Sequence, residues 1–127
     1  MDTIGNMLTS LVNAQRVKKE RVLIPYSRVH ESLLKLLEAQ GRIGHVSRKD
    51  GFPPKLMVAL KYENEQPVIH GGRRLSKPGG RRYVGADQLP YPTHGNAFYI
   101  VSTSQGLMDQ MQARREKLGG ELMCEIW

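Results

Sequence analysis

The side chains in this sequence that are best suited to a chemical function are the arginines and hydroxyls of its C-terminal half, and that function is the binding of a polyanion. Between Gln66 and Ala86 there are five basic residues and no acidic one. Neighbouring glycines let a backbone approach a phosphate closely, and Tyr83 offers a face on which a base can stack. A basic run alone is equally well explained as a solvated surface, so the glycines and the tyrosine favour binding by these residues: Arg73, Arg74, Lys77, Arg81 and Arg82.

A second candidate is the hydroxyl-rich segment 102–106, with the sequence Ser-Thr-Ser-Gln-Gly. Hydroxyls both donate and accept hydrogen bonds, which suits base edges and 2′-hydroxyls in irregular RNA. Gly106 permits a positive φ or a close ligand approach. A helix expected just after the segment would add amides that attract phosphate, although Asp109 at its start opposes an anion. Polar turns are also rich in Ser and Thr, so the segment alone does not decide the function.

Patterns typical of enzymes and metal sites are missing from the sequence. The histidines His30, His45, His70 and His94 lack metal-ligand spacing and are expected at the surface or an interface. No phosphate-binding glycine loop, dinucleotide fingerprint or nucleophile elbow occurs. The single cysteine, Cys124, allows no internal disulfide and is expected to be buried in a strand. We therefore predict no catalytic residue, no metal and no cofactor.

The length and net charge of the chain limit the kinds of partner that it can bind. A chain of 127 residues forms one compact domain or two very small ones. Its 19 Lys and Arg residues outnumber 12 Asp and Glu, and a net charge of +7 attracts nucleic acid or an anionic membrane surface. No stretch approaches 18 apolar residues, and no signal or transit pattern is present. We expect a soluble, cytoplasmic protein.

The hydrophobic periodicity of the first half predicts the order helix, strand, helix, strand, strand. Asp2 and Thr3 are expected to cap a helix over 3–14, and Pro25 to end a short strand at 22–24. Ser27 is expected to cap a second helix over 28–40, which Gly41 ends. The apolar face expected for that helix consists of Val29, Leu33, Leu36 and Leu37, and strands are expected over 43–47 and 56–62.

The second half is predicted to be richer in strands. Segments 68–74 and 81–84 are expected to form a hairpin around the turn 76–80, and 97–101 to form an apolar strand. Asp109 and Gln112 resemble a capping box for a helix to about Lys117, which Gly119 and Gly120 would end before a strand over 121–127. The fold class is therefore α+β, with an N-terminal α-β-α-β-β domain at 1–65 and a β-rich RNA-binding domain with one short helix at 66–127.

Motifs along nearly the whole chain, in almost gapless order, match one protein family. The most specific is Ser-Thr-x-x-Gly at 102–106. By these motifs the sequence resembles the bacterial small-subunit (30S) ribosomal protein S-eight family. The other matching segments are Asp2-Thr3-Ile4, Met7-Leu8-Thr9, Asn13-Ala14, Ile24-Pro25-Tyr26-Ser27, Leu60-Lys61-Tyr62, Pro67-Val68-Ile69, Arg74-Leu75-Ser76-Lys77-Pro78-Gly79, Arg82-Tyr83-Val84, Leu89-Pro90, Ile100-Val101, Gly106-Leu107-Met108, Ala113-Arg114, Gly119-Gly120-Glu121 and Trp127.

The resemblance implies a structural ribosomal protein, not an enzyme, that binds the central domain of 16S rRNA directly, helps assemble the small-subunit platform and supports translation. It also implies that the C-terminal domain makes most of the specific contacts. The implied partners are the rRNA, neighbouring small-subunit ribosomal proteins and its own operon mRNA, with no membrane and no small-molecule substrate. The implied RNA-binding residues are Ser102, Thr103, Ser104, Gly106, Tyr83, Lys77, Arg81, Arg82, Arg74 and Arg28.

Four positions depart from the family pattern. Gln105 stands where members often carry Lys, Ser10 and Val12 where they carry Arg, and Ala97 where a Gly is common. The lost charge could be regained at Arg48, Lys49, Arg73 and Arg81. Two other readings stay open, a standalone RNA-binding translational regulator and an enzyme that acts on nucleic acid. A stoichiometric presence in purified small subunits would distinguish a structural ribosomal protein from both of these alternatives.

Overall fold

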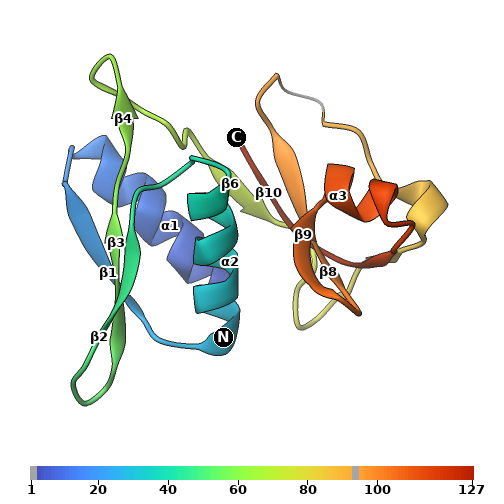
Figure 1. Cartoon of the computed structure of the whole chain (residues 1–127), viewed down its shortest axis with the longest axis horizontal. Helices are drawn as coiled ribbons and strands as arrows, with labels where there is room; N and C mark the ends of the chain where they lie inside the picture. Colours follow the sequence, from blue (N-terminus) through green and yellow to red (C-terminus); the bar gives the residue numbers. More distant parts are fainter. Residues whose placement is uncertain (1–2, 93–94) are drawn as a thin grey trace. The chain divides into compact units, whose positions relative to one another are not determined.

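The computed structural model describes residues 3–92 and 95–127 (Figure 1). It mixes helices with antiparallel sheets, which confirms the α+β class. Contacts divide the described chain into two compact units, residues 6–70 and residues 71–127 with residues 3–5. The domain limits expected from the sequence, 1–65 and 66–127, stay a prediction.

The first unit is built on an antiparallel three-stranded sheet, with the order β1-β3-β2. Both helices lie on one side of this sheet (Figure 1). Their positions confirm the two helices predicted from periodicity. The elements are α1 (Thr3–Arg16), β1 (Arg21–Pro25), α2 (Arg28–Ala39), β2 (Val46–Lys49), β3 (Lys55–Ala59) and the short pair β4 (Tyr62–Glu63) and β5 (Gln66–Pro67).

Local capping sets the ends of α2 as predicted. The Ser27 hydroxyl accepts a hydrogen bond of 3.0 Å from the His30 amide. Gly41 follows the last turn with φ +73°, a conformation that glycine adopts without steric cost. Of the two caps predicted for α1, Asp2 lies outside the described residues, and Thr3 is the first residue of the helix.

The buried face of α2 differs from the predicted one. Leu33, Leu34 and Leu37 are fully buried, whereas Val29 is 43% exposed. His30 also belongs to this face: it is buried, and its Nδ1 donates to the Pro25 carbonyl oxygen over 2.8 Å. A surface position for His30 was therefore wrong, because the ring fits the core once its nitrogen has a backbone partner.

Two strand boundaries in the first unit are also corrected. The strand expected over 43–47 begins only at Val46, and Ile43 is buried outside any strand. The strand expected over 56–62 ends at Ala59. β1 ends at Pro25 as expected, and Pro25 itself still pairs with Lys55, which is possible because β1 is an edge strand and Pro lacks only an amide donor.

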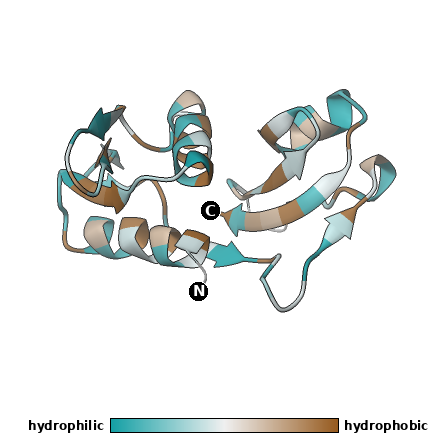
Figure 2. Cartoon of the chain, turned by 90° about the horizontal axis from the view of Figure 1, so that it is seen from below, coloured by the Kyte–Doolittle hydropathy of each residue, from teal (hydrophilic) through white to brown (hydrophobic). Residues whose placement is uncertain are grey.

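The second unit centres on β10 (Gly120–Ile126), which is mostly hydrophobic and ends at the label C in Figure 2. The sheet has the order β6-β10-β8-β9, and β7 also pairs with β10. The helix α3 lies against β8 and β9. The remaining elements are β6 (Gly72–Arg74), β7 (Tyr83–Val84), the 3-10 helix η1 (Ala86–Gln88), β8 (Phe98–Thr103), β9 (Gly106–Asp109) and α3 (Gln110–Arg115).

The predicted hairpin between segments 68–74 and 81–84 was wrong. β6 pairs with one end of β10, where Arg74 is opposite Cys124, and β7 pairs with the other, where Tyr83 is opposite Glu121. A seven-residue strand offers both short segments backbone partners that they lack for each other. The segment 75–82 therefore crosses along β10 instead of closing a hairpin.

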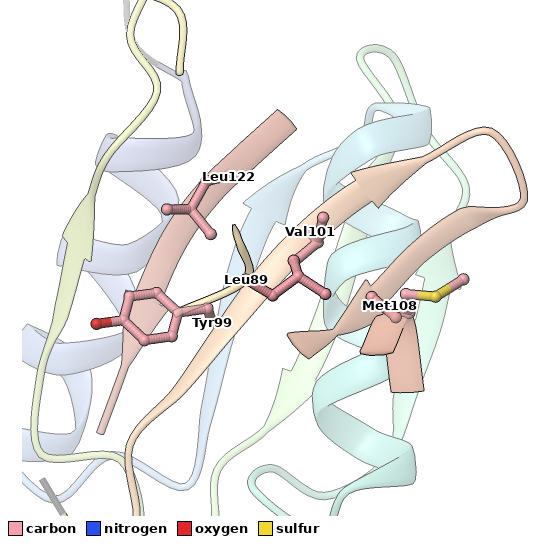
Figure 3. Packing of buried hydrophobic residues seen from close by; sticks show 6 residues of the cluster. Leu89, Tyr99, Val101, Met108 and Leu122 are labelled. Carbon is pink, nitrogen blue, oxygen red and sulfur yellow. The ribbon is translucent and has the colours of Figure 1, made fainter. Parts of the chain in front are cut away.

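A compact apolar cluster supports one face of this sheet (Figure 3). Cys124 points away from it, paired with Ile100, and is fully buried, which confirms the prediction for the cysteine. Burial raises the pKa of Tyr99, and the charge of Glu125 raises it further, so the phenol stays protonated well into alkaline pH. The cluster consists of Leu89, Tyr99, Val101, Met108, Ala113 and Leu122, with Leu75, Val84 and Leu118 packed beside it.

The short helix begins as predicted, because the Asp109 carboxylate accepts a hydrogen bond of 2.8 Å from the Gln112 amide. It does not end at the glycines. α3 stops at Arg115, and Lys117 takes φ +56°. Gly119 and Gly120 serve a different purpose, since a Cβ on either would lie within 2.4 Å of a neighbouring backbone oxygen.

Candidate nucleic-acid interface

One transverse row of the second sheet carries two of the predicted binding residues. Tyr83 on β7 is opposite Glu121 on β10, Glu121 is opposite Ser102 on β8, and Ser102 is opposite Leu107 on β9. Residues directly opposite in antiparallel strands point to the same face. The sheet therefore brings Tyr83 and Ser102 to one face, and the Tyr83 residue is 70% exposed.

The hydroxyl-rich segment 102–106 forms the turn of a β-hairpin. Thr103 ends β8 and pairs with Gly106, the first residue of β9. The Thr103 hydroxyl donates to the Gly106 carbonyl over 2.8 Å and accepts from the Gln105 amide over 3.1 Å. Gly106 has φ +113°, which favours glycine. The Thr103 hydroxyl thus holds the turn.

The sequence predicted that a helix directly follows segment 102–106, and the hairpin shows that this was wrong. β9 intervenes, so the first residue of α3 is Gln110. The helix N-terminus is therefore four residues away along the chain from Gly106. Ser104 at the tip is exposed, and within residues 3–92 and 95–127 its hydroxyl has no hydrogen-bond partner. Ser104 is thus available to a ligand.

The basic turn, residues 76–82, is anchored to β10 by one carboxylate. Glu121 accepts hydrogen bonds from the Ser76 hydroxyl and, over 3.1 Å, from the Arg81 guanidinium. The buried Ser76 hydroxyl in turn accepts from the Arg82 amide over 3.1 Å. Lys77 and Gly80 close the turn through two backbone hydrogen bonds of 2.9 and 3.2 Å. Glu121 therefore fixes the turn beside Tyr83.

The five basic residues between Gln66 and Ala86 fall into two groups. Arg73 pairs with the buried Glu125 over 2.9 Å, Arg74 donates to the Met123 carbonyl over 2.8 Å, and Arg81 pairs with Glu121. Lys77 and Arg82 are exposed, and their side chains form no hydrogen bond or ion pair with the described part of the chain. Among these five, Lys77 and Arg82 are thus the cations best placed to meet phosphate.

The structure brings nine of the ten predicted residues into one compact unit. Arg28 is the exception, because it is the exposed first residue of α2 in the other unit. Reasoning from the sequence gave no role to Ser76 and Glu121, although a serine inside a basic run and an acid after two glycines were visible. The nine are Arg74, Lys77, Arg81, Arg82, Tyr83, Ser102, Thr103, Ser104 and Gly106.

Neither a metal centre nor a membrane span is found among the described residues. No group of three or more His, Cys, Asp or Glu side chains in residues 3–92 and 95–127 could hold a metal ion. His94 lies outside the described residues. No helix of the described chain is both long and apolar enough to cross a bilayer.

Comparisons with known proteins cover nearly the whole chain. The family model described as ribosomal protein S8 matches residues 2–127. A protein named small ribosomal subunit protein uS8 from Persephonella marina is 40% identical, with 99% of this chain and 98% of the relative covered. Proteins of the same name from Sorangium cellulosum and Nitratidesulfovibrio vulgaris are each 42% identical, with the same coverage of both chains.

These matches define the class as a structural protein of the small ribosomal subunit, which is not an enzyme. The chain belongs to the ribosomal protein S8 family. The comparisons thus confirm the resemblance that the sequence motifs indicated.

Proposed function

We propose that the chain binds the central domain of 16S rRNA directly, through its second unit, and helps assemble the platform of the small subunit beside neighbouring ribosomal proteins. The observation that carries this proposal is the arrangement of the 102–106 hairpin, Tyr83 and the basic turn around one strand, β10. Neutral donors, an exposed ring and free cations within one unit are what irregular RNA requires.

Two sets of residues in this interface contribute to binding in different ways. Lys77 and Arg82 carry unpaired charge and supply attraction to phosphate that does not depend on sequence. Ser102 and Ser104 carry no charge, so they add specificity by hydrogen bonding to base edges and 2′-hydroxyls. Tyr83 offers a stacking surface between them. An mRNA segment that reproduces the same RNA helix would bind the same face.

Hydroxyl-radical footprinting tests the proposal. Purified protein is expected to protect a short, continuous region of 16S rRNA within the central domain at protein concentrations near the Kd. Protein with Tyr83→Ala is expected to need a higher concentration for the same protection, because it loses the stacking surface, worth about 1 to 3 kcal/mol per base. Protection spread evenly over the rRNA, or confined to another domain, would contradict the proposal.

The salt dependence of binding tests the basic turn. Each phosphate contact contributes about 0.7 to 0.9 to the slope of log K against log salt concentration. Arg82→Ala is expected to lower the slope by about that amount on matched and unrelated RNA alike. Arg81→Ala should lower it less, since Glu121 already neutralises Arg81. An unchanged slope when both are replaced would remove the turn from the interface.

A further inference from the structure

The first unit has an exposed sheet face to which nothing described so far assigns a function. It is the side of the β1-β3-β2 sheet away from α1 and α2 (Figure 1). Side chains on the helix side include the buried Ile24, Val46 and Leu56, and those between them along each strand are partly or fully exposed. We call the exposed side the outer face. Its residues are Arg21, Leu23, Pro25, His45, Ser47, Lys49, Lys55, Met57 and Ala59.

Strand register arranges the outer face in three rows. Arg21 and His45 lie at one end, on either side of Ala59. Lys49 and Lys55 are directly opposite each other at the other end. A neutral row that includes Met57 separates them, and the two basic rows are about 13 Å apart, the length of four strand residues. A shallow hollow lined by Arg21, His45, Ser47, Lys49, Met57 and Ala59 spans this distance, with Arg48 at its edge.

The cations of the outer face are largely unneutralised. Arg21, Lys49 and Lys55 form no ion pair with any residue that the structure describes. The acids nearby are Glu38, which is 3.4 Å from His45, and Asp50, which lines a second hollow beside Lys49 and Lys55. By contrast, Arg48 is bound by both carboxylate oxygens of Glu31 over 2.8 and 2.9 Å. That guanidinium lowers the pKa of Glu31.

The ion pairs also show which basic residues could replace the positive charge that this sequence lacks relative to the family pattern. Of the four positions that the sequence offered, Arg48, Arg73 and Arg81 are each paired with a carboxylate, and only Lys49 is unpaired in the described chain. Two lysines directly opposite each other destabilise a sheet. Lysine on an edge strand blocks aggregation, which accounts for Lys49 on β2. It does not account for Lys55, which is on the central strand β3.

We propose that the outer face of the β1-β3-β2 sheet binds the phosphate backbone of RNA, as a site separate from the interface in the second unit. Two basic rows flanking a neutral row suit a charged backbone, because phosphates at each end neutralise the lysines and the arginine. The loop between β2 and β3 adds Phe52, whose side chain is fully exposed and offers a ring for stacking on an unpaired base. An exposed ring beside free cations favours RNA over an acidic polypeptide.

A matched pair of charge variants tests the outer face. The double variant Lys49→Gln and Lys55→Gln lowers the net charge from +7 to +5, and so does the control double variant Arg115→Gln and Lys117→Gln, which changes the exposed last residue of α3 and an exposed residue just after it. On an unrelated RNA duplex, the outer-face variant is expected to lower the salt slope by about 1.4 to 1.8. The control is expected to change it by less than half of that. Equal changes in both, or none in the outer-face variant, would overturn the proposal.

Acetylation of the unaltered protein gives an independent reading. Bound duplex is expected to slow acetylation of Lys49 and Lys55 several-fold, as read by mass spectrometry, while Lys117 reacts at its free rate. Poly-glutamate serves as the acidic polypeptide, and protection of Lys49 and Lys55 by it but not by RNA would overturn the proposal. Lys77 reports on the interface in the second unit, so failure of that interface is distinguished from failure of the outer face.

Discussion

Alanine in place of Gly120 is expected to lower the free energy of unfolding by about 3 kcal/mol, the upper range for overpacking, and to abolish specific rRNA binding. An added Cβ would lie 2.1 Å from the Ser102 carbonyl oxygen and 2.9 Å from the Ser102 carbonyl carbon. Both atoms are backbone, so no side-chain rotation relieves the clash. β10 must move away from β8 at the row that carries Tyr83, Glu121 and Ser102.

Chemical denaturation and RNA titration measure the two consequences of this change. Gly79→Ala is the matched control, because a Cβ at Gly79 meets nothing within 4 Å, and it should change stability by at most about 0.5 kcal/mol. If Gly120→Ala were as stable as Gly79→Ala, the close approach of β10 and β8 would not exist in solution. If Gly120→Ala lost stability but kept its full affinity for rRNA, the row of Tyr83, Glu121 and Ser102 would have no role in RNA recognition.

Replacing both Thr103 and Ser104 with alanine is expected to weaken binding to the cognate rRNA fragment by about 2 to 3 kcal/mol, at 1 kcal/mol or somewhat more for each lost hydrogen bond. Binding to an unrelated duplex should hardly change, since neutral hydroxyls add little long-range attraction. The measurement is a pair of titrations at one salt concentration. Circular dichroism confirms that the variant is folded.

Single variants separate the turn from the contact. The Thr103 hydroxyl is used within the hairpin, so Thr103→Ser, which keeps that hydroxyl, should retain most of the affinity. Ser104→Ala removes a hydroxyl that has no partner in the described chain and should lose affinity without loss of stability. Equal losses on both RNAs, or none, would make segment 102–106 a polar turn only and move the search for specificity to Tyr83.

Elements governed by local sequence were predicted well. The helices α1 and α2 follow from apolar spacing and α3 from its capping residues, and Ser27 and Asp109 make the capping bonds that their side chains suggested. A capping bond joins residues three apart, so its partners are fixed before any tertiary contact forms. The nine candidate residues of the second unit were also named from sequence, because charge, hydroxyls and an aromatic ring are visible as residue types, and their role in binding stays a prediction.

Pairings between distant residues could not be predicted. Nothing near segments 72–74 and 83–84 reveals that both pair with β10, which is more than 35 residues further along. Likewise, the arginines look alike in sequence, but Glu121, Glu125 and Glu31 come from elsewhere to neutralise three of them. The short strand β9 was missed because only Leu107 and Met108 mark it.

The central place of β10 sets an order of events during synthesis. β6 leaves the ribosome 46 residues before β10 begins, a delay of about 2 to 9 s at 5 to 20 residues per second. Until residues 120–126 emerge, β6, β7 and β8 lack their common partner. The three strands of the first unit's main sheet, β1-β3-β2, are complete by Ala59. In a nascent chain of this protein, the face that carries Tyr83 and Ser102 is therefore completed last, after the strands of the first unit's main sheet have all been synthesised.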